Sequence, residues 1–170
     1  MRVPLVISNH SNLEEVCNGF KVPFKLVQVD INNKFNSEKQ ILDLMTEFKI
    51  DLGVLAKYMQ ILSGSFLKKF PNLINIHHSF LPAFKGAQPY HQAWERGVKL
   101  IGATAHYVTE DLDAGPIIDQ EVESVQHYHS VHDLIRLGRD CERSALAKGI
   151  RYHVHDRIIL DGHRAIVFPD

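Results

Sequence analysis

An amide, an imidazole and a carboxylate are the groups in this sequence that could act together on an acyl group. Asn75 and His77 end an apolar run, and residues two apart in a strand project to the same face. Asp113 lies in a turn before Gly115 and Pro116, and such rigid loops can aim a carboxylate. Together these groups could stabilise an oxyanion and move a proton while an acyl group is attacked or released.

The same residues also have a structural interpretation. His77 could be a hydrogen-bonded core histidine and Asn75 a turn residue, and spacing alone leaves both interpretations open. Ser79 follows His78, but neighbouring strand residues point to opposite faces. No nucleophile elbow surrounds Ser79, so we interpret it as a structural residue and expect no acyl-serine.

Other chemical groups in the sequence favour simpler interpretations. The histidines at 127, 129, 132, 153 and 155 form neither an HExxH pattern nor a Cys/His ligand spacing, so we expect no metal site. Lys85-Gly86 is interpreted as an ordinary loop lysine, and no GxGxxG or Walker pattern occurs. Most aromatic residues near this segment are expected to pack in the core; they are Phe80, Phe84, Tyr90 and Trp94.

The bulk composition excludes several classes of protein. The chain has 170 residues, is 45% hydrophobic and 23% charged, and carries a net charge of −1. This predicts one globular domain with no broad basic surface for nucleic acid. No run approaches the roughly 20 apolar residues of a membrane span, and we see no signal-peptide pattern in the first residues. Cys17 and Cys141 belong to no CxxC pair, which favours two thiols in the cytoplasm.

Hydrophobic periodicity predicts an α/β fold of the Rossmann-like type, with a mostly parallel sheet and helices on both faces. We expect strands at 3–8, 24–29, 51–56, 73–77, 100–108 and 117–125. We expect helices at 37–48, 65–70, 89–97 and 130–152, with capping boxes at Ser37 and Ser130. Asp161-Gly162 predicts a C-terminal hairpin with a type I′ turn. Ligands bind at the carboxyl ends of such strands, which places Asn75, His77 and residues 57–63 at one rim.

Residues 74–93 read INIHHSFLPAFKGAQPYHQA, and residues 102–118 read GATAHYVTEDLDAGPII. Both stretches resemble the formyltetrahydrofolate deformylases, as do residues 58–63 and 157–168. The folate-dependent formyltransferases share a looser form of both stretches. The doubled histidine at 77–78 and the Ala105-His106-Tyr107-Val108 motif favour the deformylase branch. The resemblance covers nearly the whole chain, from about Val3 to Phe168.

This resemblance implies a formyltransferase-like fold and the hydrolysis of 10-formyltetrahydrofolate to tetrahydrofolate and formate, which supplies formate for one-carbon and purine metabolism. The family's catalytic residues fall on Asn75, His77 and Asp113. Asp113 would position the attacking water, and its charge would favour protonated His77. The folate cleft would be lined by Tyr58, Met59, Gln60, Ile61 and Leu62, and by Thr109, Glu110, Asp111, Leu112 and Gly115. A small-molecule folate is the expected partner, with no cofactor and with a possible homo-oligomer.

The resemblance also has gaps. Deformylases often carry an N-terminal ACT-type domain, and their catalytic domain usually opens with a strand and a helix before the segment matching residues 3–8. We therefore expect residues 1–170 to be a single catalytic domain that is truncated at its N-terminus. Two alternatives stay open. One is a formyltransferase of the glycinamide ribonucleotide type, although no phosphate-binding loop is seen near the N-terminus. The other is an inactive folate-binding remnant.

Overall fold

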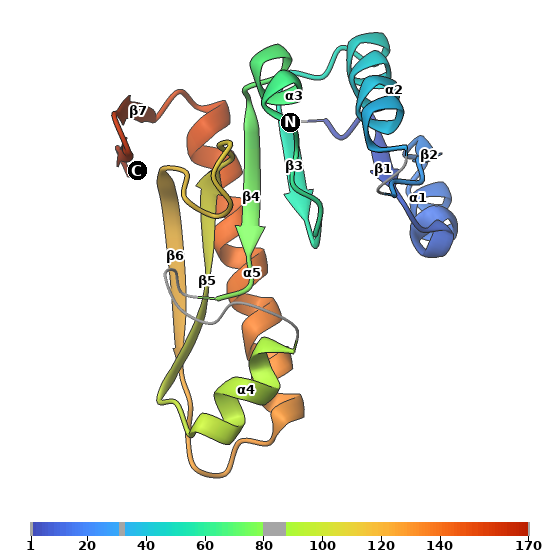
Figure 1. The fold of residues 1–170 in the computed structure, drawn as a ribbon. Coiled ribbons are helices and arrows are strands. Elements are labelled where there is room, and N and C mark those ends of the chain that lie inside the picture. The colour runs from blue at the N-terminus through green and yellow to red at the C-terminus, as the bar shows by residue number, and fades with distance from the viewer. Residues whose placement is uncertain (1, 31–32, 80–87, 170) are drawn as a thin grey trace. The chain divides into compact units, whose positions relative to one another are not determined.

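The computed structural model describes residues 2–30, 33–79 and 88–169 (Figure 1). The interpretations of Lys85-Gly86, Phe80 and Phe84 fall outside these residues. The chain divides into one unit of residues 1–52 and 62–71, and a second of residues 53–61 and 72–170. Among the described residues, no helix is long and apolar enough to cross a membrane.

The described part of the first unit contains a pair of short parallel strands, a 3-10 turn and three α-helices. The strands β1 (Val6–Ser8) and β2 (Phe24–Leu26) pair in parallel and are shorter than expected. Between them lie a 3-10 turn (Ser11–Leu13) and α1 (Glu14–Gly19), neither of which was expected from the sequence pattern. The helices α2 (Lys34–Glu47) and α3 (Gly64–Lys69) follow, and Ser63 caps α3 by accepting a hydrogen bond from the Phe66 N–H.

The predicted capping box at Ser37 is wrong. The helix α2 begins at Lys34, so Ser37 lies within its first turns. The Ser37 hydroxyl lies 2.8 Å from the carbonyl oxygen of Gln28 and donates to it. Asp30 and Asn33 exchange backbone-to-side-chain hydrogen bonds of 2.8 and 3.1 Å just before the helix. This local turn starts the helix earlier than the Ser37 pattern indicates.

The second unit is built on a four-stranded sheet in the order β3-β4-β5-β6. The strands are β3 (Gly53–Ala56), β4 (Leu73–His77), β5 (Leu100–Tyr107) and β6 (Ile117–Ser124). β3 and β4 are parallel, whereas β5 runs antiparallel to β4 and β6 antiparallel to β5. The α/β class is confirmed, but the sheet is mixed. The reversal arises because the chain leaves β4 at His77, passes through α4 (Pro89–Arg96) and returns along β4.

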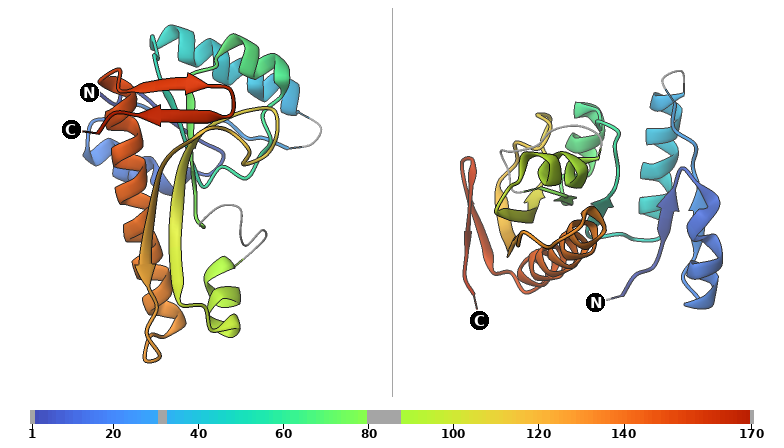
Figure 2. Two further views of the ribbon diagram at one scale, coloured as in Figure 1. Left: turned by 90° about the vertical axis from the view of Figure 1, so that its left-hand side faces the viewer. Right: turned by 90° about the horizontal axis from the view of Figure 1, so that it is seen from below.

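The long helix α5 (Val131–Val154) covers one face of this sheet and runs alongside β5 and β6 (Figure 2). Its predicted capping box is confirmed, since Ser130 and Asp133 exchange hydrogen bonds. Gly149 lies so close to Ala105 that an added Cβ would stand 3.1 Å from the Ala105 side chain. The Tyr107 hydroxyl lies 2.8 Å from His153 Nδ1 of the helix. α5 therefore covers the face to which Ala105 and Tyr107 project.

The helix α4 is held against α5 by a polar contact and an apolar cluster. The Tyr90 hydroxyl donates to Glu142 Oε1 over 2.9 Å. Ala93 of α4, Ile101 of β5 and Leu134 of α5 form a buried cluster against which Tyr90 packs. The core position expected for Tyr90 is therefore confirmed. Trp94 stays half exposed and donates from Nε1 to the His129 carbonyl oxygen.

The C-terminal hairpin is confirmed, and consists of β7 (Ile158–Asp161) and β8 (Arg164–Val167). Its predicted turn type is wrong. Asp161 pairs with Arg164, so Gly162 and His163 form the two-residue turn. A type I′ turn needs positive φ at both central residues, but of these two described residues only Gly162 has it, at 61°.

Candidate active site

The face of the sheet opposite α5 carries the candidate catalytic side chains. Asn75 of β4 pairs with His106 of β5, and His77 pairs with Thr104. Directly opposed residues of an antiparallel pair project to the same face. The period of two that predicted a shared face for Asn75 and His77 therefore also brings His106 and Thr104 to that face. His77, His106 and Thr104 are buried.

Asp113 reaches this face from the loop between β5 and β6. The loop leaves the sheet beside the amino end of β4, where the Val108 N–H donates to the Leu73 carbonyl oxygen. Gly115 then passes so close to the Tyr107 backbone that no Cβ would fit there. Asp113 itself adopts a left-handed conformation, with φ of 54°. The loop thus folds back over the sheet from the end opposite to His77.

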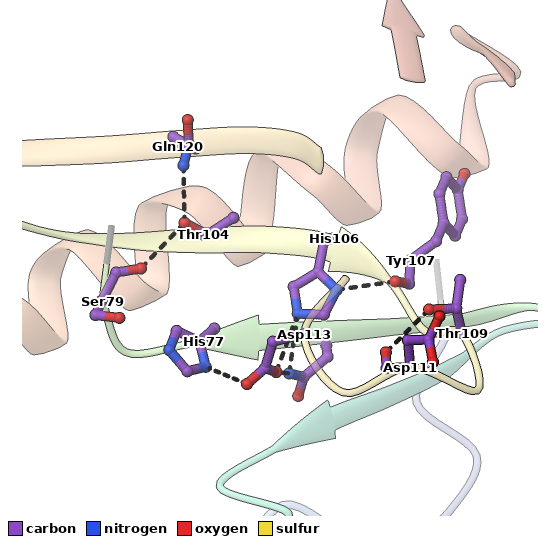
Figure 3. Close-up of polar contacts among 10 residues, drawn as sticks. His77, Ser79, Thr104, His106, Tyr107, Thr109, Asp111, Asp113 and Gln120 are labelled. Carbon is purple, nitrogen blue, oxygen red and sulfur yellow. Dashed lines mark hydrogen bonds and ion pairs between the residues drawn. The ribbon is translucent and has the colours of Figure 1, made fainter. Parts of the chain in front are cut away.

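The Asp113 carboxylate contacts three side chains of the sheet (Figure 3). Its Oδ2 lies 3.3 Å from His77 Nδ1, and its Oδ1 lies 3.6 Å from His106 Nε2. The Asn75 amide Nδ2 donates to Oδ1 over 3.5 Å. The structure therefore brings together the amide, the imidazole and the carboxylate that the sequence indicated.

His106 is a member of this cluster that reasoning from the residues did not single out. Its Nδ1 lies 2.8 Å from the Tyr107 carbonyl oxygen, which can only accept, so Nδ1 carries a hydrogen. In the neutral ring, Nε2 is then an acceptor for Asn75 Nδ2, 3.2 Å away. The period of two along the strand 100–107 indicates that Thr104 and His106 share a face. Only the antiparallel pairing of β5 with β4, however, places His106 opposite Asn75.

The protonation of His77 is governed by burial more than by Asp113. Burial lowers the pKa of His77, the Asp113 carboxylate opposes this by raising it, and His78 and His106 lower it further. Asp113 thus favours the protonated ring, as expected, but burial outweighs it and the net shift of the His77 pKa is downward. The neutral ring donates from Nδ1 to Asp113 and leaves Nε2 as the basic nitrogen. That Nε2 is buried and has no hydrogen-bond partner among the described residues.

His78 and Ser79 follow the end of β4 and make different contacts. The His78 ring stacks on the His77 ring, with centroids 4.8 Å apart and planes at 19°. Alternation does not separate them, because β4 ends at His77. Ser79 is buried, and its carbonyl oxygen accepts a hydrogen bond from Thr104 Oγ1, which in turn accepts one from Gln120. These contacts agree with a structural interpretation of Ser79.

The residues expected to line a folate cleft fall into two groups. Residues 58–61 follow β3, whose carboxyl end lies beside that of β4 because Ala56 pairs with Ile76. Met59 and Ile61 are 76% and 53% exposed, whereas Leu62 is buried and belongs to the first unit. In the loop after β5, the Thr109 hydroxyl donates to the Asp111 carbonyl oxygen. The remaining positions are half-buried Tyr58, exposed Gln60, Glu110, Asp111 and Leu112, and buried Gly115.

The fold and this cluster together define a class of protein. The sequence pattern of the formyl transferase family matches residues 1–150. The chain therefore belongs to the formyl transferase family.

Individual relatives point to one branch of that family. A curated relative named formyltetrahydrofolate deformylase, from Synechocystis sp., is 53% identical over 98% of this chain and 58% of its own length. The crystal structure of a formyltetrahydrofolate deformylase from Pseudomonas putida has a TM-score of 0.93 at 46% identity and covers 99% of this chain. The chain spans 60% of that structure, so it corresponds to little more than half the length of such relatives.

A more distant structure belongs to the transferase branch. The glycinamide ribonucleotide transformylase 1 of Symbiobacterium toebii has a TM-score of 0.88 at 32% identity. It aligns with 99% of this chain and 81% of its own length. The shared architecture is the α/β formyltransferase fold, with helices on both sides of a sheet that contains parallel strands.

Proposed function

We propose that the protein hydrolyses 10-formyltetrahydrofolate to tetrahydrofolate and formate, and so supplies formate for one-carbon and purine metabolism. The observation that supports this best is the Asp113 carboxylate in contact with both His77 Nδ1 and Asn75 Nδ2. This arrangement provides an oxyanion donor beside an oriented base. The names of the most similar relatives support the same reaction.

In the proposed mechanism, Asn75 stabilises the oxyanion. Its amide nitrogen carries two hydrogens, one directed to His106 Nε2 and one to the more distant Asp113 Oδ1. The second contact is long at 3.5 Å, so a formyl oxygen can take that hydrogen with little loss. Loss of one such donor typically costs about 2.7–4 kcal/mol of transition-state stabilisation.

His77 and Asp113 move the protons. Asp113 holds the Nδ1–H of His77, which leaves Nε2 to accept a proton as water attacks the formyl carbon. The water oxygen bonds to that carbon, and the C=O electrons move to the oxygen that faces Asn75. The C–N bond then breaks as the folate nitrogen receives the proton from Nε2, and formate leaves.

The decisive experiment supplies 10-formyltetrahydrofolate without any amine acceptor. We expect equal amounts of formate and tetrahydrofolate, and we expect Asp113→Asn to reduce both by about 10²-fold or more. Turnover that begins only when glycinamide ribonucleotide is added would instead assign the chain to the transferase branch. Tight folate binding without turnover would assign it to an inactive remnant.

The glycinamide ribonucleotide transferase is the second candidate, and its support is the structural likeness to the Symbiobacterium toebii enzyme. The lower identity, 32% against 53% for the deformylase from Synechocystis sp., makes it the weaker proposal.

We further propose a small-molecule folate as substrate, a reaction without a cofactor, and a location in the cytoplasm. Cys17 and Cys141 are free and buried, which suits a reducing compartment. Association into homo-oligomers stays a prediction that sedimentation of the purified chain can test.

A further inference from the structure

Two imidazole rings lie face to face at the carboxyl end of β4. The centroids of His77 and His78 are 4.8 Å apart and their planes differ by 19°. The two residues are adjacent in the chain, so this contact requires the backbone to turn directly after the strand ends at His77. The contact therefore belongs to the local geometry of the candidate site.

Each ring also has a buried nitrogen that no described residue hydrogen-bonds. Nε2 of His77 and Nε2 of His78 are both shielded from solvent and form no hydrogen bond with any described residue. Leaving such atoms unpaired costs free energy, and unsatisfied buried groups often mark functional sites. His77 has a role for its free nitrogen in the proposed reaction, whereas His78 has none.

We propose that His78 is a positioning residue for His77, whose stacked ring holds the His77 imidazole in the orientation that keeps Nε2 free to accept a proton. The hydrogen bond from His77 Nδ1 to Asp113 anchors one edge of the ring. A single contact at one edge leaves the ring free to tilt, and the flat face of His78 restrains that tilt. This inference rests on the proposed function, because it assigns His77 Nε2 as the base.

The charges around His77, like the stacked ring, bear on whether its Nε2 stays free to accept a proton. Three titratable groups act on His77 among the described residues, namely Asp113 in the loop after β5, His106 on β5 and adjacent His78. Asp113 raises the pKa of His77, while a positive charge on His78 or His106 lowers it. Burial is the largest cause of the lowered pKa of His77, and His78 adds to it, so His77 remains neutral beside the Asp113 carboxylate.

Two variants distinguish the effect of the flat His78 ring from the effect of its ability to ionise. His78→Phe keeps a flat ring but cannot ionise, and it removes a buried nitrogen that has no described partner, so we expect it to fold. His78→Leu removes the flat ring as well. His132→Phe, at an exposed position on α5, is the matched control. Thermal unfolding of each variant establishes that it is folded before its kinetics are compared.

The expected results differ between the two variants. His78→Leu lowers kcat for formate release by about tenfold or more while KM changes little, because the base is misaligned. His78→Phe retains most of kcat, but the acid limb of its pH–rate profile moves to higher pH, because the interaction with His78 that lowers the pKa of His77 is lost. The control moves neither quantity. An unchanged kcat in His78→Leu, or an unchanged acid limb in His78→Phe, would overturn the proposal.

A readout that needs no turnover separates this inference from the proposed function. The His77 ring signals, assigned by comparison with His77→Gln, are titrated by NMR in the wild-type protein and in His78→Phe. We expect His77 to protonate at higher pH in His78→Phe. That shift in a protein that releases no formate would support the role of His78 and would contradict only the proposed reaction.

Discussion

Asn75 and His106 face each other across the antiparallel pair of β4 and β5, with Asn75 Nδ2 3.2 Å from His106 Nε2. The Tyr107 carbonyl oxygen holds the other ring nitrogen of His106 as a donor. In its neutral form the ring offers only a lone pair to the amide, and this sets which end of the Asn75 side chain faces Asp113. An imidazole on a neighbouring strand thus orients the proposed oxyanion donor.

Replacement of Asn75 should remove the oxyanion donor without disturbing the sheet. We expect Asn75→Ala to lower kcat for formate release by about 10²–10³-fold, with a smaller change in KM. Asn12→Ala, at an exposed position of the first unit, is the matched control. Steady-state assays with 10-formyltetrahydrofolate measure both. A variant at Asn75 with wild-type kcat would contradict the role of the amide.

Removal of the Asp113 charge should move the pH dependence in the opposite direction to His78→Phe. Asp113 raises the pKa of His77, so in Asp113→Asn that pKa should fall further. The acid limb of the pH–rate profile should then shift to lower pH, while kcat drops by about 10²-fold or more. Asparagine tolerates the left-handed backbone at this position, so the loop should keep its shape. A shift to higher pH would show that His77 does not act as the base.

Substitution of His106 tests whether the orientation of Asn75 matters. We expect His106→Ala to lower kcat by about tenfold, because the amide loses the acceptor that fixes it. His106→Gln provides a carbonyl oxygen near the position of Nε2 and should recover much of that loss. Kinetic comparison of the two variants is the measurement. Equal losses in both would indicate that the ring acts through packing alone.

Gly115 should be intolerant of any side chain. A Cβ there would collide with the Tyr107 backbone carbonyl, so Gly115→Ala must displace the loop that carries Asp113. We expect a loss of about 1–3 kcal/mol in the free energy of unfolding, together with reduced formate release. Gly19→Ala, in α1 with open space around it, should instead stabilise the protein by up to about 1 kcal/mol. Urea denaturation distinguishes the two.

Stability should decline as the pH falls toward the region where histidine protonates. Burial lowers the pKa values of His77 and His153 below the ordinary value of about 6.5. Between those lowered values and about 6.5, the unfolded chain binds more protons than the folded one, so the free energy of unfolding falls with falling pH. We expect a shallower decline for His77→Gln and no change for exposed His163→Gln. Denaturant titrations at several pH values above about 5.5 avoid the carboxyl groups.

Features that depend on near neighbours in the chain could be predicted well. The bounds of β4 are those that the apolar run indicated, and the Ser130 capping box begins α5 as expected. The shared face of Asn75 and His77 followed from the strand period alone, because alternation is a property of each strand. The capping box predicted at Ser37 was wrong because the Ser37 hydroxyl donates to the carbonyl oxygen of Gln28 instead. A helix-start pattern considers only residues three apart and does not include this contact.

Features that depend on how strands pair could not be predicted from hydrophobic periodicity. Whether β5 runs parallel or antiparallel to β4 decides if His106 faces Asn75, and hydrophobic periodicity is the same in either case. The contact of Asp113 with His77 needs a loop that doubles back over the sheet, held by the close passage of Gly115 along Tyr107. The local pattern thus specified that Asn75 and His77 share one face of β4. Long-range packing placed Asp113 and His106 beside them, and these contacts orient the two side chains.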